Sequence, residues 1–462
     1  MKIAFCASEV VPFSKTGGLA DVSGSLPLAL EKLGQETVVV MPLYQAARAQ
    51  KAVALKKFKD DVWSAVIGRA TRVFFIENDP YFNREGIYGD KAGDYPDNLE
   101  RFTFFNQRCL QLFREIGFRP DIIHCHDWQT CLIPAYLKCL PAKDDFYAKT
   151  KTLLTIHNIG YQGVFPREQF PETGLDWKYF NPGQLEYYDK LNLLKGGIIF
   201  ADAINTVSRT YAREIQTKEF GFGLEGVLKA RGAEVFGITN GVDYGIWNPA
   251  TDPYLAKKFS ADKFKDKAKN KKDLQEACSL PVKNLPVVGI VSRLAQQKGF
   301  DIIASSIDEL CRLGLQLVIL GSGDKKYHHL LQEAARGHPE SVSFNTGFND
   351  ALAHKIYGGA DAFLMPSHYE PCGLGQLISF RYGTVPIVYK TGGLADTVSS
   401  KTGFLFDLYS GPELVKTVWK AVLKYTGHRG EWDEMAVHGM KLNFSWDESA
   451  TQYVCLYEKI CS

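Results

Sequence analysis

The chain has no large excess of one charge, no long apolar run and no cysteine pair at metal-binding spacing. Its 54 Lys and Arg residues stand against 52 Asp and Glu residues, a net charge of +2. This balance argues against a nucleic-acid binder held by a broad basic field. No apolar stretch approaches the roughly 20 residues that span a bilayer, and no signal for export is visible. We therefore expect no membrane anchor and no nucleic-acid partner.

The ten cysteines contain no C-x-x-C pair, and a chain of 462 residues is large enough to need no disulfide staples. We expect reduced thiols and a cytoplasmic protein. The G-x-x-x-x-G-K-[ST] phosphate-binding loop is missing, and the one G-x-G-x-x-G run, at residues 221–226, does not follow a predicted strand. Neither a P-loop nor a standard dinucleotide-binding turn is predicted.

Short β-prone runs alternate with amphipathic segments along almost the whole chain, the pattern of parallel sheets flanked by helices. With 45% apolar and 13% aromatic residues, and at roughly 150 residues per domain, the chain can form two or three packed domains. Strands are predicted at residues 2–7, 37–41, 72–76, 122–125, 152–157 and 203–207, and in a second series at 287–291, 317–320, 362–365 and 385–389. Helices are predicted at residues 19–33, 99–116, 128–139 and 185–199.

Residues 240–272 separate the two series of strands. The segment opens with Asn-Gly and Asn-Pro pairs, which mark turns, and continues into the Lys-rich run 263–272. We predict a hinge between two α/β domains here, with the lysines on a solvated helix face.

One internal repeat is present: the sequence KTGGLAD occurs at residues 15–21 and again at 390–396. Each copy precedes a predicted helix. A Gly-Gly turn at a helix start lets backbone N–H groups approach an anion, and Lys15 adds a full positive charge. A structural tight turn is the alternative, but the lysine and the duplication favour a ligand-binding loop in two related halves.

The second half places charged residues directly after predicted strands. Arg293 and Lys298 follow the strand at 287–291, where a guanidinium and an ammonium suit a diphosphate whose negative charge grows as it leaves. Gly321 marks another glycine turn. Glu370 stands just before a glycine turn and a helix start, where a carboxylate can hold a sugar hydroxyl while the following amides face a phosphate.

Two histidines of the first half, His124 and His126, share one face of a predicted strand. With Asp127 they raise the possibility of a zinc site. No further ligand stands at supporting spacing, so we favour hydrogen-bonding histidines. A D-x-D pair that would carry a sugar nucleotide on a divalent ion is not evident either. The residues therefore favour a metal-free mechanism assisted by Arg and Lys.

Taken together, these motifs resemble the glycogen synthase and starch synthase family, glucan synthases that use a nucleotide-linked glucose. The resemblance runs in family order from the start of the chain to its last hundred residues. The matching positions are 15–21, 126–128, 157–158, 217–224 (TKEFGFGL), 240–243, Arg293 with Lys298, 370–374 and 390–393.

The resemblance implies an α/β fold of GT-B type, with two Rossmann-like doubly wound parallel-sheet domains facing across a deep cleft. The implied domains are residues 1–240 on the acceptor side and 241–445 on the donor side, followed by a helix, 446–462, that packs back on the first domain. The implied reaction transfers glucose from ADP-glucose to the non-reducing 4-OH of an α-1,4-glucan with retention. No cofactor and no metal are expected, and closure of the two domains is the expected conformational step.

The resemblance also assigns roles to particular residues. Arg293 and Lys298 neutralise the departing diphosphate, and Lys15 reaches the same region. Glu370 supports the transferred glucose, and His157 hydrogen-bonds its 6-OH. Further donor contacts fall on Gly17, Gly18, Gly321, Phe348 (against the adenine), Cys372, Gly373, Leu374, Thr391, Gly392 and Gly393. Acceptor or glucosyl contacts fall on Asp21, Asp127, Asn158 and Asn240.

Two positions depart from related patterns. Ile378 stands where many sugar-nucleotide transferases of this architecture have a second Glu, which leaves the ribose partner unassigned. Gly375 stands where many bacterial members have Thr, which affects fine donor contacts.

Three alternatives remain at this point. The chain could be a glucan-binding scaffold without activity, although Lys15, Arg293, Lys298, His157 and Glu370 are all present. It could use UDP-glucose, or it could act on a small acceptor. A plastid location, after removal of a transit segment, is the alternative to the cytoplasm.

Overall fold

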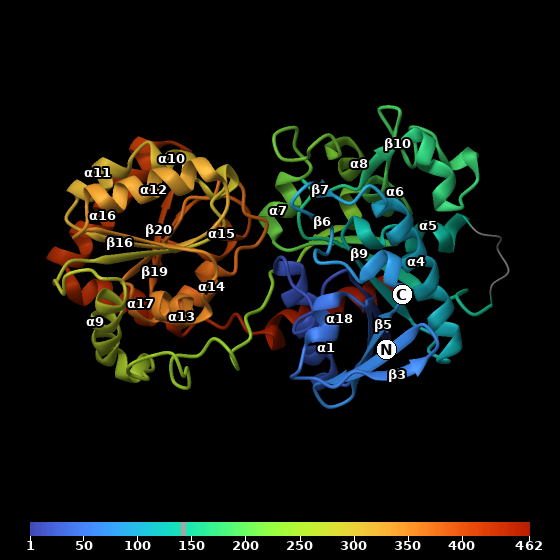
Figure 1. The fold of residues 1–462 in the computed structure, drawn as a ribbon, viewed down its shortest axis with the longest axis horizontal. Coiled ribbons are helices and arrows are strands. Elements are labelled where there is room, and N and C mark those ends of the chain that lie inside the picture. Colours follow the sequence, from blue (N-terminus) through green and yellow to red (C-terminus); the bar gives the residue numbers. More distant parts are fainter. Residues whose placement is uncertain (140–144) are drawn as a thin grey trace. The chain divides into compact units, whose positions relative to one another are not determined.

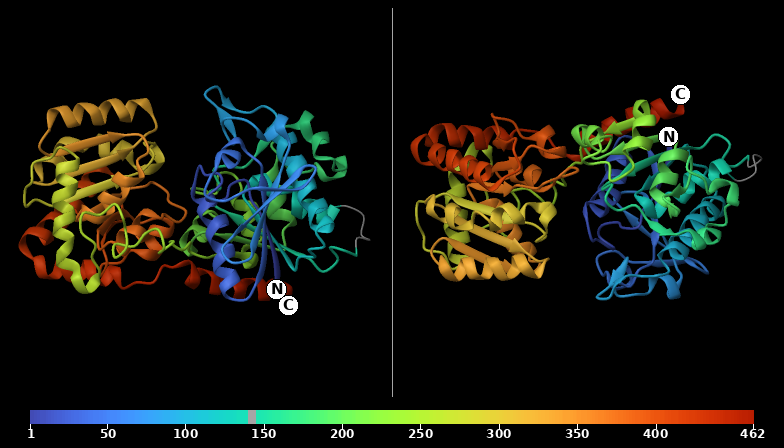
Figure 2. Two further views of the ribbon diagram at one scale, coloured as in Figure 1. Left: turned by 60° about the horizontal axis from the view of Figure 1, so that its bottom comes forward. Right: turned by 90° about the horizontal axis from the view of Figure 1, so that it is seen from above.

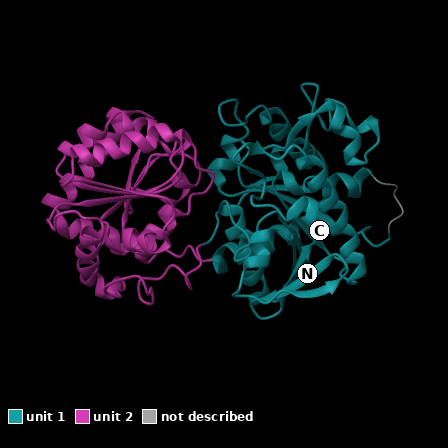
Figure 3. Cartoon of the chain, in the orientation of Figure 1, with its two compact units in different colours: residues 1–241, 446–462 teal, residues 242–445 magenta. Residues whose placement is uncertain are grey.

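A computed structural model describes residues 1–139 and 145–462. The chain divides into two compact units, unit 1 with residues 1–241 and 446–462 and unit 2 with residues 242–445 (Figure 3). All ten cysteines are free thiols. Within the described ranges, no helix is long and apolar enough to cross a membrane.

Unit 1 is built on a nine-stranded sheet whose central strands are parallel and buried. The order is β14 (Val235–Gly237), β13 (Ala203–Thr206), β9 (Lys151–Ile156), β8 (Ile122–His126), β1 (Lys2–Cys6), β2 (Glu36–Pro42), β5 (Thr71–Ile76), β4 (Val62–Ile67) and β3 (Lys56–Lys59). Only β4 and β3 run antiparallel to their neighbours. The chain order reverses at β1, which lies between β2 and β8. In open α/β sheets, ligands bind beside such a switch point, at the carboxyl ends of the strands.

Helices cover both faces of this sheet (Figure 1). One face carries α1 (Gly18–Lys32) and α18 (Trp446–Cys461), which pack against each other. The other carries α4 (Asn98–Glu115), α5 (Leu132–Cys139) and α6 (Leu193–Phe200). Shorter helices are α2 (Gln45–Ala49), α3 (Asp79–Phe82), α7 (Arg209–Glu214) and α8 (Glu225–Ala230).

Unit 2 has a six-stranded sheet that is parallel throughout. The order is β17 (Val342–Thr346), β16 (Gln316–Gly321), β15 (Val287–Val291), β18 (Ala362–Met365), β19 (Val385–Tyr389) and β20 (Phe404–Phe406), so its switch point is at β15. One apolar core packs α10 (Phe300–Ala304), α11 (Ile307–Arg312), α12 (Lys325–Gly337), α16 (Gly411–Gly427) and α17 (Arg429–Met440) on one face. A second core packs α9 (Lys267–Ala277), α13 (Asp350–Gly359) and α14 (Gly375–Arg381) on the other, and α15 (Gly392–Thr397) follows β19. Two parallel-sheet Rossmann-like units confirm the predicted fold class.

The C-terminal helix belongs to unit 1 although its sequence follows unit 2. In Figure 2, α18 (red) lies beside α1 (blue), and Lys32 pairs with Asp447 at 2.9 Å. Where the chain enters this helix, a Cβ on Gly241 would come within 2.5 Å of the Trp446 backbone. A glycine is therefore needed at that position for the two segments to run so close together.

The predicted helix over residues 185–199 is wrong in its first half. Glu186–Tyr187 (β11) and Lys190–Asn192 (β12) form a small antiparallel sheet with β10 (Val164–Pro166), and α6 begins only at Leu193. The side chain of Asn192 accepts a hydrogen bond from the Lys195 amide and so caps the helix. A cap of this kind fixes where a helix starts.

The prediction of a solvated face for the Lys-rich run 263–272 is also partly wrong. Lys267 is 6% exposed, and its Nζ lies within hydrogen-bond distance of three carbonyl oxygens and of Thr384 Oγ1. Two of the carbonyls are in the last turn of α13, and the third, of Tyr382, caps α14. The ammonium therefore satisfies the carboxyl ends of two helices at once, which the helix dipoles favour.

Replacing Lys267 by Met should lower the free energy of unfolding by at least about 2 kcal/mol, because buried carbonyls lose their donor. Urea unfolding followed by tryptophan fluorescence measures the change. Lys269→Met in the same helix is the matched control, since Lys269 is exposed. Its effect should stay within about 0.5 kcal/mol. Equal losses in both variants would contradict the anchoring role of Lys267.

Candidate functional site

The predicted donor residues of unit 2 all follow the carboxyl ends of parallel strands. Because these ends lie on one edge of the sheet, the loops that carry the residues share that edge. Arg293 and Lys298 follow β15, Gly321 ends β16, Phe348 follows β17, Glu370 through Leu374 follow β18, and Thr391 through Gly393 follow β19.

Lys298 and Glu370 are brought into direct contact. Lys298 Nζ lies 2.6 Å from Glu370 Oε2, which also accepts a hydrogen bond from Ser367 Oγ at 2.9 Å. Glu370 is 6% exposed. Gly299 has φ +79°, and a Cβ there would come within 2.1 Å of the Pro366 carbonyl oxygen. A glycine after Lys298 therefore lets the two loops pack backbone to backbone.

The second KTGG loop packs against the same carboxylate loop. The amide of Gly393 donates to the Glu370 carbonyl oxygen at 3.1 Å. A Cβ on Gly392 would meet that oxygen at 1.9 Å, and one on Gly393 would meet the Cys372 carbonyl oxygen at 2.0 Å. The paired glycines are thus required by the close approach of two protein segments.

Two predicted donor residues of unit 2 project from the protein surface. Arg293 is exposed, whereas its neighbour Leu294 is fully buried. Phe348 is 88% exposed, the largest exposed fraction among the exposed large apolar side chains in the described ranges. It follows Gly347, which has φ +97°. A bare aromatic ring of this kind is available to stack on a planar ligand.

In unit 1, the first KTGG loop is held by a buried carboxylate that the sequence analysis missed. Glu9 is 3% exposed, and its side chain accepts hydrogen bonds from the Thr16 amide, from Thr16 Oγ1 at 2.6 Å and from the Gly17 amide at 3.2 Å. Tyr88 donates a further hydrogen bond to Glu9 at 2.6 Å. The Gly17 amide is therefore already paired within the unit, while Gly18 begins α1. An acidic residue directly after a buried strand was the available signal.

The two predicted charged residues at this loop pair with each other. Lys15 Nζ lies 2.8 Å from Asp21 Oδ1, and the lysine side chain is 51% exposed. Its ammonium is thus held at the start of α1 yet remains open to solvent.

Asp127 and His157 are joined at the ends of β8 and β9. Asp127 adopts φ +54°, and its Oδ1 accepts a hydrogen bond from the His157 amide at 2.7 Å. Burial raises the pKa of Asp127 to about 7, against the opposing effect of the backbone N–H groups of His157 and Asn158. Burial lowers the pKa of His157 to about 3, so this imidazole is neutral at physiological pH.

Asn158 and Asn240, which were also predicted to contact the acceptor or the glucose, follow β9 and β14. Asn158 Oδ1 accepts a hydrogen bond from the Gly160 amide at 2.9 Å and so shapes the turn after His157. Asn240 is 5% exposed, and its Oδ1 is buried with no hydrogen-bond partner in the described part of the chain. Such an orphaned acceptor needs an explanation, which a ligand donor can supply.

His124 and His126 make hydrogen bonds, as the sequence favoured. His124 Nδ1 lies 2.8 Å from Tyr457 Oη of α18, and its Nε2 lies 2.7 Å from Thr155 Oγ1. His126 Nδ1 lies 2.9 Å from His157 Nε2. Across residues 1–139 and 145–462, no group of three or more His, Cys, Asp or Glu side chains is arranged to hold a metal ion.

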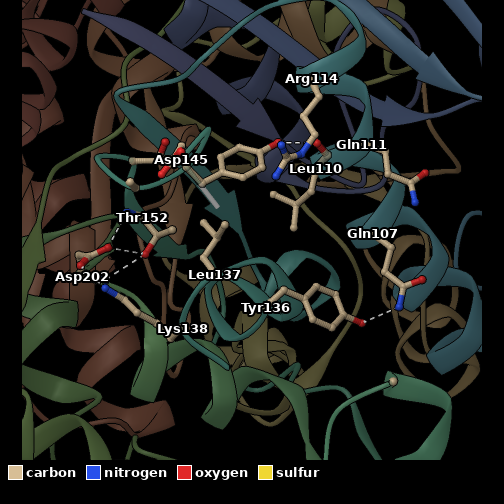
Figure 4. A pocket seen from close by; sticks show the side chains of 14 residues that line it. Gln107, Leu110, Gln111, Arg114, Tyr136, Leu137, Lys138, Asp145, Thr152 and Asp202 are labelled. Carbon is tan, nitrogen blue, oxygen red and sulfur yellow. Dashed lines mark hydrogen bonds and ion pairs between the residues drawn. The ribbon is translucent and has the colours of Figure 1, made fainter. Parts of the chain in front are cut away.

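Each unit also has a cavity that contains none of the predicted site residues. The cavity of unit 1, of about 500 Å³, lies between α4 and α5, and Figure 4 shows Arg114, Tyr136 and Lys138 around it. Its polar walls are paired internally, for example Lys138 with Asp202 at 2.8 Å. The cavity of unit 2, of about 300 Å³, lies beside Lys267 and Lys271.

Two Rossmann-like units that carry cations, a carboxylate and neutral imidazoles at their strand ends define a glycosyltransferase of GT-B type. The comparisons with known proteins agree. Residues 2–230 match the family model for the starch synthase catalytic domain, and residues 271–436 match that for glycosyl transferases group 1.

Full-length relatives are found among glycogen synthases. The chain is 48% identical to the glycogen synthase of Geotalea uraniireducens over 99% of this chain and 98% of the relative. It is 44% identical to that of Thermotoga petrophila over 99% of both chains. The structure matches the catalytic domain of starch synthase IV from Arabidopsis thaliana with a TM-score of 0.89 and 32% identity, covering 100% of this chain and 99% of that one. The chain belongs to the glycogen synthase and starch synthase family.

Replacing Asp127 by Asn should stabilise the protein, and more so at pH 8 than at pH 5. The pKa of Asp127 is raised to about 7 in the folded state, so the free energy of unfolding falls as the pH rises from the ordinary Asp range to about 7. The Asn side chain does not titrate, so the variant keeps its stability over that range. Melting temperatures of both proteins across this pH range measure the difference. A difference that is the same at pH 5 and pH 8 would count against the raised pKa.

Proposed function

We propose that the protein is a retaining glucosyltransferase that transfers glucose from ADP-glucose to the non-reducing 4-OH of an α-1,4-glucan, without a metal ion and in the cytoplasm. Unit 2 binds the nucleotide sugar, and unit 1 contacts the glucose and the glucan. The observation that carries this proposal is the Lys298–Glu370 pair, which lies at the switch point of unit 2.

The pair suits a departing diphosphate beside a sugar. Lys298 and the exposed Arg293 both follow β15, where they can neutralise the charge that grows on the leaving group. In the described part of the chain, the side-chain hydrogen bonds to Glu370 come from Lys298 and Ser367, and both fall on Oε2. This leaves Oε1 to accept a hydrogen bond from a glucose hydroxyl.

Retention needs no protein nucleophile in this arrangement. The leaving phosphate itself can take the acceptor proton on the face from which it departs. The protein then positions the reactants and stabilises charge, which are the terms that dominate when no covalent step is required. A Glu370 carboxylate that shares Oε2 with an ammonium and a hydroxyl fits electrostatic support of the sugar.

Three of the unit 1 residues suit the sugar side. His157 is neutral, so it can hydrogen-bond a hydroxyl without adding charge. Asn240 offers a buried, unpaired Oδ1 to a hydroxyl. Asp21, beside Lys15 at the start of α1, completes the set.

The adenine nucleotide is supported by a relative and by an aromatic ring. The matching starch synthase IV structure is described as bound to ADP and acarbose. Phe348, exposed at the strand edge, offers a face to a purine ring. A uracil could stack on the same ring, so UDP-glucose is the alternative donor that the assay must distinguish.

Independence from metal ions is supported by the cations available. Lys15, Arg293 and Lys298 supply three positive charges for a diphosphate, and the sequence has no evident D-x-D pair for a divalent ion.

Purified protein should lengthen maltooligosaccharides with ADP-glucose, and EDTA should not abolish the reaction. Chain length and released nucleotide are followed together, with UDP-glucose in a parallel reaction. Lengthening with UDP-glucose alone would refute the donor assignment, and glucan binding without lengthening would favour the scaffold. Loss of activity in EDTA that a divalent ion restores would refute the metal-free mechanism.

Lys298→Gln should weaken donor binding and slow transfer, whereas Glu370→Ala should reduce kcat by about 100-fold or more while ADP binding is largely retained. Steady-state kinetics and ADP titration separate the two effects. Lys283→Gln is the matched control, because this lysine forms an exposed ion pair with Glu340 elsewhere in unit 2. An unchanged kcat in Glu370→Ala would remove this residue from the site.

A further inference from the structure

Three imidazoles form a row in the interior of unit 1. His124 and His126 both lie in β8 and are fully buried. Their ring centroids are 4.2 Å apart, and those of His126 and His157 are 5.2 Å apart with an interplanar angle of 26°. Phe5 of β1 packs nearly parallel to His126 at 5.8 Å. The row therefore ends at His157, the residue proposed to contact the glucose.

All three rings are neutral. Burial lowers the pKa of each, and for His124 and His126 the neighbouring imidazoles lower it further. A neutral imidazole has one N–H donor and one acceptor nitrogen. The hydrogen bond between His126 Nδ1 and His157 Nε2 therefore couples the tautomers of the two rings.

The second ring nitrogen of His126 decides between the two possible arrangements. Its Nε2 is buried and has no hydrogen-bond partner in the described residues. If His157 donated the shared hydrogen bond, His126 would carry its proton on this nitrogen and bury an unpaired donor. If His126 donates it, Nε2 keeps only a lone pair. A buried N–H group without a partner is rarer and costs more free energy than a buried lone pair without one. The arrangement in which His126 donates is therefore favoured.

We propose that His126 is a positioning residue: its Nδ1–H donates to His157 Nε2 and holds His157 as the Nδ1–H tautomer, which donates a hydrogen bond to a hydroxyl oxygen of the bound sugar. The sugar contact rests on the proposed function, but the tautomer does not. Asp127 supports the same arrangement, since it fixes the His157 backbone amide at 2.7 Å. Ring and backbone of His157 are thus held by two different residues.

The tautomer is measured directly in the unmodified chain. Imidazole nitrogens labelled with ¹⁵N are observed by long-range NMR correlation, and His157 is assigned by the signals missing in His157→Asn. We expect Nδ1 of His157 to be the protonated nitrogen in the ligand-free protein. Protonation at Nε2 would overturn the proposal, whether or not the protein transfers glucose.

Kinetics test the consequence for the reaction. His126→Leu removes the donor and should lower kcat by about 10- to 100-fold, because a misplaced contact acts mainly at the transition state. The KM for the donor should change much less. His126→Asn places an amide N–H near the position of Nδ1 and should restore most of the lost rate.

Thr155→Val is the control for disturbance of the buried network, because its hydroxyl contacts His124 but not His126 or His157. Its kcat should stay within about threefold of the unmodified enzyme. A full rate in His126→Leu, or equal losses in His126→Asn and His126→Leu, would overturn the positioning role. If no nucleotide sugar supports transfer by the unmodified protein, the proposed function fails while the NMR result still decides the tautomer.

Discussion

Parallel strand pairing is the constraint on which the candidate site depends. A parallel strand must be followed by a crossover, so every strand of unit 2 delivers its next loop to the same edge of the sheet. Residues as distant in sequence as Arg293 and Thr391 are thereby brought to the same edge. The glycines at 299, 392 and 393 then allow the loops to approach to backbone contact. The fold thus determines where the site lies, and the glycines allow its loops to pack closely against one another.

Electrostatic pairing within each unit shapes how a donor can bind. Lys15 and Lys298 each pair with a carboxylate, but the Lys298–Glu370 pair is much less exposed than the Lys15–Asp21 pair. Attraction between charges is stronger where water is excluded, so the diphosphate of the proposed donor would compete with Glu370 for Lys298. The exposed guanidinium of Arg293 can bind the proposed diphosphate first, at a lower free-energy cost than Lys298. In the proposed reaction, Glu370 and the diphosphate share one ammonium, which keeps the carboxylate close to the sugar.

Patterns that are local in sequence were predictable, and contacts between distant segments were not. Ten parallel strands were found within one or two residues, because their apolar β-branched runs indicate burial directly. The parallel strands β14, β17 and β20, the antiparallel strands β3 and β4 and the hairpin before α6 were missed, because they are short or partly exposed. Glu9 and Lys267 were missed because a charged residue in isolation predicts solvent exposure. The carbonyl partners of Lys267 are far away in the chain, whereas the backbone partners of Glu9 are the nearby Thr16 and Gly17 amides.

The C-terminal helix extends this argument to the imidazole row. Tyr457 and Tyr453 of α18 hydrogen-bond His124 and Asn205, on the sheet face opposite α6. The last residues of the chain therefore complete the polar interior beneath His157. The helix α18 follows residues 242–445 in the sequence, yet it belongs to unit 1. The polar interior of unit 1 is thus completed by a segment that follows unit 2 in the sequence.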